Sequence, residues 1–152
     1  MTRAMVVFES MFGNTEAVAR AIADGLSTGM QVQAVPVSEA PNAIDGDVAL
    51  LLAGGPTHAF GMSRASTRGD AVKQGGQPTG GLDVGLREWL SRLRRGSSDV
   101  AAVAFDTRIK KRGVPGSAAR GARRATTPAG IPDCGPGTLL LCWRHAGTVA
   151  GR

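Results

Sequence analysis

The chain has 152 residues, of which 42% are hydrophobic, so it can form one domain with a genuine core. It contains no run of about 18 apolar residues and no long apolar segment after Arg3, so we predict neither a membrane span nor a signal peptide and expect a cytoplasmic protein. Residues 1–107 hold 9 Lys/Arg and 11 Asp/Glu, whereas residues 108–152 hold 9 and 1, so the net charge of +6 comes from the last third.

The first predicted element is a strand over residues 4–9, because this nearly continuous apolar run suits a parallel strand that is covered on both faces. Small polar residues follow it, and a helix is predicted over residues 14–26, with Val18, Ile22 and Leu26 on one face. The amides of such a loop and the helix N-terminus form a ready anion site, to which Ser10 and Thr15 add hydroxyl groups. Neither a dinucleotide fingerprint nor a Walker A loop is present.

This loop, with the sequence ESMFGNT at residues 9–15, resembles the phosphate loop of flavodoxins and flavodoxin-like proteins. The family pattern is hydroxyl, any residue, hydroxyl, Gly, Asn, Thr, and Phe12 stands where the second hydroxyl is expected. The resemblance implies that the loop holds the phosphate of flavin mononucleotide (FMN) without a basic side chain. The candidate contacts are Ser10, Met11, Phe12, Gly13, Asn14 and Thr15. The alternative is an ordinary strand-to-helix turn without a ligand.

Two further strands are predicted next. Residues 31–37 alternate polar and apolar side chains and contain Pro36, which is typical of an edge strand, whereas the very apolar residues 47–53 indicate a central one. The loop that follows, GGPTHAFGMS, resembles the flavin-ring loop of flavodoxin-like quinone reductases. That resemblance makes Pro56, Thr57, His58, Phe60 and Gly61 candidates beside the ring, with Phe60 stacking on it. The alternative for Phe60 is an anchor in the core.

Residues 64–81 are polar and glycine-rich, so we expect at most a helical turn and a loose connection. A helix is predicted over residues 84–95, with Trp89 in the core rather than on a flavin. Residues 100–105 form a fourth buried strand, and by resemblance the loop that begins at Asp106 and Thr107 covers the second face of the flavin. The basic residues 108–112 read as a solvated loop; without interleaved aromatic residues, we do not favour a nucleic-acid contact.

The C-terminal part departs from the pattern. A last helix is predicted over residues 114–126, but prolines and glycines interrupt residues 127–152, where a candidate strand spans only residues 138–143. We therefore predict a flavodoxin-like domain over residues 1–126 and an atypical Gly/Pro-rich tail over residues 127–152. The fold class is an α/β three-layer, doubly wound parallel sheet of order 2-1-3-4-5, with its fifth strand in question.

An out-of-frame reading is our hypothesis for this tail. Codons permitted for residues 138–145, read from the second base of each, can spell Pro-Phe-Phe-Phe-Val-Gly-Gly-Thr, which resembles the last strand and glycine-rich loop of the family. The gene sequence tests this hypothesis. Cys134, Cys142 and His145 lack a fourth ligand and a regular spacing, so we predict no metal site.

The resemblance implies non-covalent FMN binding and electron transfer, either as an electron carrier or as an FMN-dependent oxidoreductase. The expected partner is a redox protein or a small quinone-like acceptor, and no side chain is required as an acid–base catalyst. The alternative is a flavodoxin-like scaffold or binding module without a cofactor and with a damaged C-terminus. A basic nucleic-acid binder is the third hypothesis, and it requires binding that depends steeply on salt.

Overall fold

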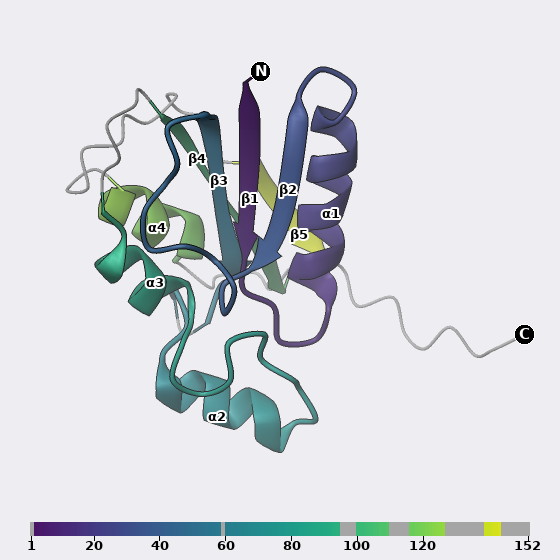
Figure 1. Cartoon of the computed structure of the whole chain (residues 1–152). Coiled ribbons are helices and arrows are strands. Elements are labelled where there is room, and N and C mark those ends of the chain that lie inside the picture. The colour runs from purple at the N-terminus through teal and green to yellow at the C-terminus, as the bar shows by residue number, and fades with distance from the viewer. Residues whose placement is uncertain (1, 59, 95–99, 110–115, 127–138, 144–152) are drawn as a thin grey trace, which may run out of the picture.

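The computed structural model describes residues 2–58, 60–94, 100–109, 116–126 and 139–143. Strands and helices alternate along much of these residues, as Figure 1 shows. In chain order the elements are β1 (Arg3–Phe8), α1 (Asn14–Leu26), β2 (Gln31–Pro36), β3 (Val48–Pro56), α2 (Ala65–Lys73), α3 (Leu86–Arg92), β4 (Ala101–Ile109), α4 (Ala118–Thr126) and β5 (Leu139–Trp143). Within these residues, no helix is long and apolar enough to cross a membrane.

The strands form one parallel sheet in the order β2-β1-β3-β4-β5, which confirms the predicted fold class. The apolar run of β1 lies at the inner position between β2 and β3, where both of its faces are covered, and Ala4 to Phe8 are buried. The half-exposed β2 is an edge strand, as its alternation predicts. Pro36, which has no amide hydrogen to donate, stands at its last position.

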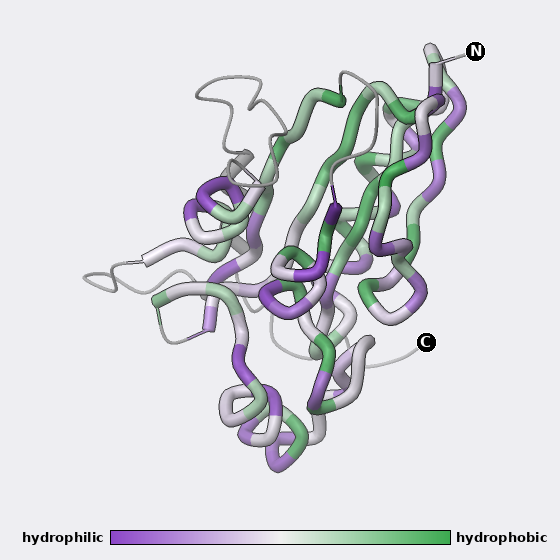
Figure 2. Tube along the Cα trace, turned by 60° about the vertical axis from the view of Figure 1, so that its left-hand side comes forward, coloured by the Kyte–Doolittle hydropathy of each residue, from purple (hydrophilic) through white to green (hydrophobic). Residues whose placement is uncertain are grey.

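Helices cover the two faces of the sheet and create two core clusters (Figure 1). On one face, α1 packs through Ala19 on Val6, Phe8, Leu52 and Phe105. On the other face, α3 and α4 pack on the opposite side chains of the same strands, and this larger cluster contains Trp89. Figure 2 shows the hydrophobic strands running between more polar segments.

Trp89 is a core residue, as predicted from the periodic face of its helix. Its side chain is buried, and its indole Nε1 donates a hydrogen bond of 2.9 Å to the carbonyl oxygen of Pro41. The indole therefore fastens α3 to the segment before β3 through this hydrogen bond and its packing in the core.

A fifth strand is present, which settles the doubt about it. Residues Leu139–Trp143 form β5, which pairs in parallel with Phe105 to Ile109 of β4. This strand lies inside the segment that we predicted as an atypical tail, and it extends the sheet by one position. The candidate strand at residues 138–143 is thus confirmed. The prolines and glycines around it had left its place in the sheet in doubt, although a five-residue strand needs only a short uninterrupted run. Arg108 and Ile109, which we predicted as the start of a solvated loop, belong to β4. The rest of the basic run, as well as Cys134 and His145, lies outside the described residues.

Residues 64–81 contain more structure than the predicted turn and loose connection. They form the nine-residue helix α2, whose start is closed by a hydrogen bond of 2.9 Å from the Arg64 amide to Thr67 Oγ1. Polar composition misled the prediction, because α2 does not pack on the sheet. It lies beyond the carboxyl ends of the strands instead (Figure 1), next to the candidate site.

Candidate functional site

The candidate site lies where β1, β3 and β4 end. The loops after these strands meet at the carboxyl edge of the sheet because the strands are parallel and adjacent. The chain leaves β1 toward one side for β2, and it returns to the other side for β3. Ligands of doubly wound sheets bind at such a point, where two neighbouring connections diverge and leave a crevice.

The loop after β1 presents unpaired amides. Gly13 is the N-cap of α1 with a φ of 86°, a left-handed conformation that favours glycine. The first helical hydrogen bond runs from Ala17 N to Gly13 O, at 3.0 Å. Among the described residues, no acceptor faces the amides of Asn14, Thr15 and Glu16, and no side chain caps the helix. Three N–H groups and the positive end of the helix dipole are thus free for an anion.

A segment that the sequence did not single out fixes this loop. The amides of Gln77 and Thr79 donate hydrogen bonds of 2.7 and 3.0 Å to the carbonyl oxygens of Met11 and Ser10. In return, the Ser10 amide donates to Thr79 Oγ1 at 3.2 Å. The connection after α2 therefore clamps the loop from outside.

Three of the predicted phosphate contacts, Ser10, Met11 and Phe12, differ in how exposed their side chains are. Ser10 is buried, and its hydroxyl accepts a hydrogen bond of 3.1 Å from the Gly13 amide, while its own hydrogen has no acceptor among the described residues. Met11 is also buried, so its side chain packs in the interior and its carbonyl oxygen accepts from Gln77 N. Phe12 is 54% exposed, and a Cβ on Gly76 would lie 3.0 Å from its ring. The absence of a side chain at Gly76 therefore makes room for Phe12.

Two threonine hydroxyls link this loop to β4. Thr15 Oγ1 and Thr107 Oγ1 are 2.7 Å apart, and both residues are buried. This contact confirms that the two segments, which the sequence places far apart, lie side by side.

Asp106 and Thr107 lie within β4, so the prediction that they begin the loop after it is wrong, because the strand continues to Ile109. From this position Asp106 still orders the start of α4. Its Oδ2 accepts hydrogen bonds from Ser117 Oγ at 2.5 Å, from the Ala119 amide at 3.1 Å and from Thr57 Oγ1 at 3.2 Å. The carboxylate thereby caps the first turn of α4, where negative charge is favourable. Asp106 is fully buried, and its Oδ1 has no hydrogen-bond partner among the described residues. A buried acceptor without a partner is uncommon in folded proteins.

The loop after β3 forms a tight turn at residues 58–61. The amides of His58 and Gly61 donate to each other's carbonyl oxygens at 2.8 and 3.1 Å. Phe60 occupies this turn with a φ of 72°, rare for a residue with a side chain, and is 61% exposed. Its side chain is not a core anchor, so the alternative that we considered for it is wrong. The exposed aromatic ring is therefore accessible to a ligand or partner.

Neighbouring residues hold the turn in place. Pro56 ends β3 in register with Thr107, and Thr57 N donates to Thr107 O at 2.8 Å.

Burial lowers the pKa of His58 below 6.5, and the charge of Arg68 lowers it further, so the imidazole is neutral at neutral pH. Arg87 donates to the Met62 and Ser63 carbonyl oxygens at 3.0 and 3.3 Å.

A buried charged network beneath these loops was missed by the sequence interpretation. Arg68 and Glu9 are 0% and 1% exposed, and Arg68 Nη1 lies 3.8 Å from Glu9 Oε1. Ser63 bridges them: it donates to Glu9 Oε1 and accepts from Arg68 Nη1 at 2.8 Å. The Leu86 amide donates to Glu9 Oε2 at 2.6 Å, and Arg68 Nη2 lies 3.0 Å from Glu88 Oε1.

Burial raises the pKa of Glu9 above 4.5, although the Leu86 amide, Ser63 and Arg68 act in the opposite direction. For Glu88, burial acts to raise the pKa, but the adjacent Arg68 guanidinium and backbone donors outweigh it and lower the pKa below 4.5. The signal that could have revealed this network was Glu9 itself, a carboxylate at the end of a buried apolar run. Such a position demands a buried partner.

The structure therefore brings the predicted residues of three loops to one edge of the sheet. Together the fold and this edge define a doubly wound α/β protein with a candidate anion and ring site at the switch point between β1 and β3.

The comparisons with known proteins agree with this class. The model of the flavodoxin family matches residues 6–79, from β1 to the segment that clamps the phosphate loop. These 74 of the 152 residues are thus similar in sequence to flavodoxins. No curated protein sequence matches the chain.

Solved flavodoxins share the fold. A flavodoxin from the domain Archaea is 18% identical, with a TM-score of 0.60, and the match covers 97% of this chain and 87% of that one. The flavodoxin of Streptococcus pneumonia is 18% identical, with a TM-score of 0.57 and coverage of 87% and 79%. A cysteine-to-serine mutant of flavodoxin from Pseudomonas aeruginosa is 14% identical, with a TM-score of 0.53 and coverage of 97% and 87%.

Proposed function

We propose that this chain binds FMN non-covalently and transfers electrons. The observation that carries the proposal is the free N-terminus of α1, where three amides without an acceptor stand beside the Ser10 and Thr15 hydroxyls. This donor set fits a phosphate group, and the absence of a lysine or arginine from the loop does not prevent binding, because helix amides alone serve anions. Phe12 contributes no hydroxyl, so one potential donor is missing.

The loop after β3 suits an aromatic ring, because the exposed Phe60 offers an aromatic face. Thr57 and His58 precede Phe60 in the chain, and Thr57 Oγ1 donates to Asp106 Oδ2 at 3.2 Å, which ties this loop to β4. A flavin nucleotide combines a phosphate with an aromatic ring, and these are the two groups that the loops suit.

The protein's part in the chemistry is to bind and orient. FMN, when bound, supplies one- and two-electron redox chemistry. The amides at residues 14–16 position the phosphate, the Phe60 turn covers the ring, and Asp106 orders the loop after β4 by capping α4. The electron acceptor is a redox protein or a small quinone-like molecule, and NAD(P)H and quinone assays distinguish an oxidoreductase from a carrier.

The test is a comparative titration of the purified apoprotein with FMN and with riboflavin, followed by quenching of flavin fluorescence. FMN and riboflavin differ only in the phosphate. We therefore expect FMN to bind at least roughly tenfold more tightly than riboflavin, since charge-assisted hydrogen bonds to a phosphate contribute more than 1.4 kcal/mol. Inorganic phosphate should weaken FMN binding and leave riboflavin binding unchanged.

Thr15→Ala is the matching variant, and Thr28→Ala, at an exposed position just beyond the C-terminal end of α1, is its control. The first should weaken FMN binding and the second should not. If the protein is folded by circular dichroism and binds neither flavin, the FMN proposal is wrong and the scaffold without a cofactor takes its place. Equal affinity for FMN and riboflavin would show that the loop at residues 10–15 does not bind the phosphate.

A further inference from the structure

A groove separates α3 from α4 on the outer side of the sheet. It encloses about 620 Å³ and lies apart from the phosphate loop. Its apolar lining comes from Met62, Leu90, Leu93 and Ala125, and its charged lining comes from Arg87 and Arg124. The groove thus combines an apolar floor with cationic walls.

A missing side chain keeps the groove open. Gly121, on α4, faces Met62, and a Cβ at this position would lie 3.3 Å from the Met62 methyl carbon. The glycine also lowers the helix propensity of α4 by about 1 kcal/mol relative to alanine, so helix stability does not explain it. Filling the position is therefore a direct way to close the groove.

The two helices that form the groove carry an unbalanced charge. Their residues include Arg87, Arg92, Arg120, Arg123 and Arg124, whereas Glu88 is their only acidic residue. Glu88 is turned toward the buried Arg68, so it does not neutralise the surface. Within the described part of the chain, Arg92 and Arg124 make no ion pair.

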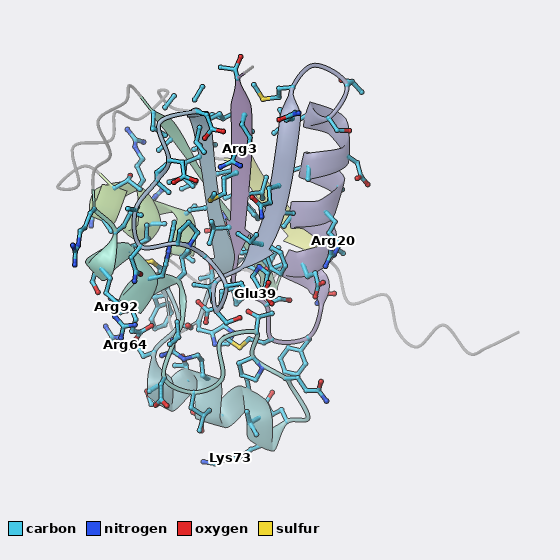
Figure 3. All side chains as sticks on the ribbon, in the orientation of Figure 1. Arg3, Arg20, Glu39, Arg64, Lys73 and Arg92 are labelled. Carbon is cyan, nitrogen blue, oxygen red and sulfur yellow. The ribbon has the colours of Figure 1, made fainter. Side chains whose placement is uncertain are left out.

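Figure 3 shows Arg92 and Arg64 on the side of the molecule that carries α3, and Arg20 on α1, away from them. Arg20 is also neutralised locally, because its guanidinium lies 2.7 Å from Glu16. The positive charge therefore accumulates on the helical face that contains the groove.

We propose that this groove is the docking site for an acidic protein partner, which inserts an apolar side chain between α3 and α4 and places flanking carboxylates on Arg92 and Arg124. Charge complementarity selects this occupant, since the apolar lining binds a hydrophobic side chain and the guanidinium groups of Arg92 and Arg124 bind carboxylates. Arg87 and Met62 connect the groove to the turn at residues 58–61. The partner would thus dock beside the loop that we assign to the flavin ring, although the proposal does not require FMN.

The experiment uses the full chain and a fluorescent synthetic peptide in which a leucine and a tryptophan stand between runs of glutamate. Binding is followed by polarisation at fixed ionic strength, without FMN and with saturating FMN. We expect saturable binding in both conditions. Replacing the glutamates by glutamines, or the two apolar residues by serines, should abolish it, because both halves of the groove contribute.

Two variants have matched controls on the opposite face of the sheet. Arg124→Gln removes a charge from the groove, and Arg20→Gln removes one from α1. Gly121→Leu fills the groove, and Gly25→Leu makes the same change on α1, where nothing lies within 4 Å of a Cβ. The two groove variants should weaken peptide binding at least roughly fivefold, and the two controls less than twofold. Circular dichroism confirms that each variant is folded.

Several results would overturn the proposal. Absence of peptide binding by the folded protein would show that no acidic segment docks there. If Arg124→Gln and Arg20→Gln weaken peptide binding equally, the peptide responds to the net charge of the protein and not to the groove. If Gly121→Leu binds the peptide as tightly as the wild type, the groove is not the peptide-binding site. Displacement of the peptide by single-stranded DNA at equal charge would assign the surface to nucleic acid instead.

Discussion

Thr15 Oγ1 lies 2.7 Å from Thr107 Oγ1, and this contact joins the first turn of α1 to the end of β4. One of the two hydroxyls donates to the other, so one hydrogen is used in the pair and the second hydroxyl hydrogen stays available. A single contact thus fixes the relative position of two loops and still leaves a donor for a ligand.

The first prediction concerns this pair. Thr107→Val leaves the Thr15 hydroxyl buried without its partner, so the free energy of unfolding should fall by about 1–3 kcal/mol. Thr15→Val should cost a similar amount. The double variant should lose less than the sum, because neither unsatisfied hydroxyl remains. Urea unfolding of the four proteins measures the coupling, and strict additivity of the two losses would show that the contact contributes nothing.

The second prediction concerns Arg68. Arg68→Met removes the cation that faces Glu9 and Glu88, as well as the hydrogen bond of 2.8 Å from Nε to Leu82 O. Loss of one partner of a buried ion pair costs about 3–5 kcal/mol, and we expect a decrease of this size in urea unfolding. Arg64 is exposed and is labelled in Figure 3. Arg64→Met is therefore the control and should change stability by less than about 0.5 kcal/mol.

A second substitution distinguishes charge from packing in this network. Glu9→Gln combined with Arg68→Met removes the stranded carboxylate, so it should recover part of the lost stability. If the double variant is less stable than Arg68→Met alone, the buried charge is not the cause of the loss.

The third prediction is a pH dependence. Because burial raises the pKa of Glu9 above 4.5, the folded protein binds this proton more tightly than the unfolded chain. Glu9 therefore favours the folded state below pH 4.5, and this contribution is lost as the pH rises through the higher folded pKa. The stability of Glu9→Gln relative to the wild type should increase with pH across this window, by at most about 1.4 kcal/mol per pH unit.

Urea unfolding at several pH values measures this difference. Glu39→Gln, an exposed carboxylate in Figure 3, is the control. A difference between Glu9→Gln and the wild type that falls with rising pH would mean that the pKa of Glu9 is lowered rather than raised.

The fourth prediction separates stability from binding at Phe60. Phe60→Gly relieves a left-handed backbone conformation that costs about 1 kcal/mol or more, so the variant should be as stable as the wild type or more stable. If Phe60 stacks on the flavin ring, the same change should weaken FMN binding roughly tenfold. Thermal unfolding and the flavin titration give the two values. Unchanged affinity would remove Phe60 from the site.

Much of the fold could be predicted from local sequence. The run at residues 4–8 and the run at residues 48–53 are apolar throughout, so their place inside a parallel sheet follows from composition alone. The turn at residues 10–15 could be predicted as well, because Gly and hydroxyl residues are typical of a helix start. Its role as a phosphate site came from the resemblance and stays a prediction.

The rest depended on contacts between distant residues. Nothing local to Arg68 indicates that its side chain is fully buried, because its partners Glu9 and Leu82 belong to other loops. The clamp at Gln77 and Thr79 is made by backbone groups, which every sequence possesses. The flavin contacts themselves and the out-of-frame origin of the C-terminus stay predictions, which the titration and the gene sequence test.

The strand order also relates the sheet to the synthesis of the chain on the ribosome. β1 emerges first, β2 pairs on one side of it, and β3, β4 and β5 then add one after another on the other side. Each new strand joins an edge that already exists, so the nascent sheet can grow without opening earlier pairs. β4 exposes an unpaired edge until Leu139–Trp143 has left the ribosome. A pause in translation before that point would prolong the interval in which the edge of β4 is open to pairing with another chain.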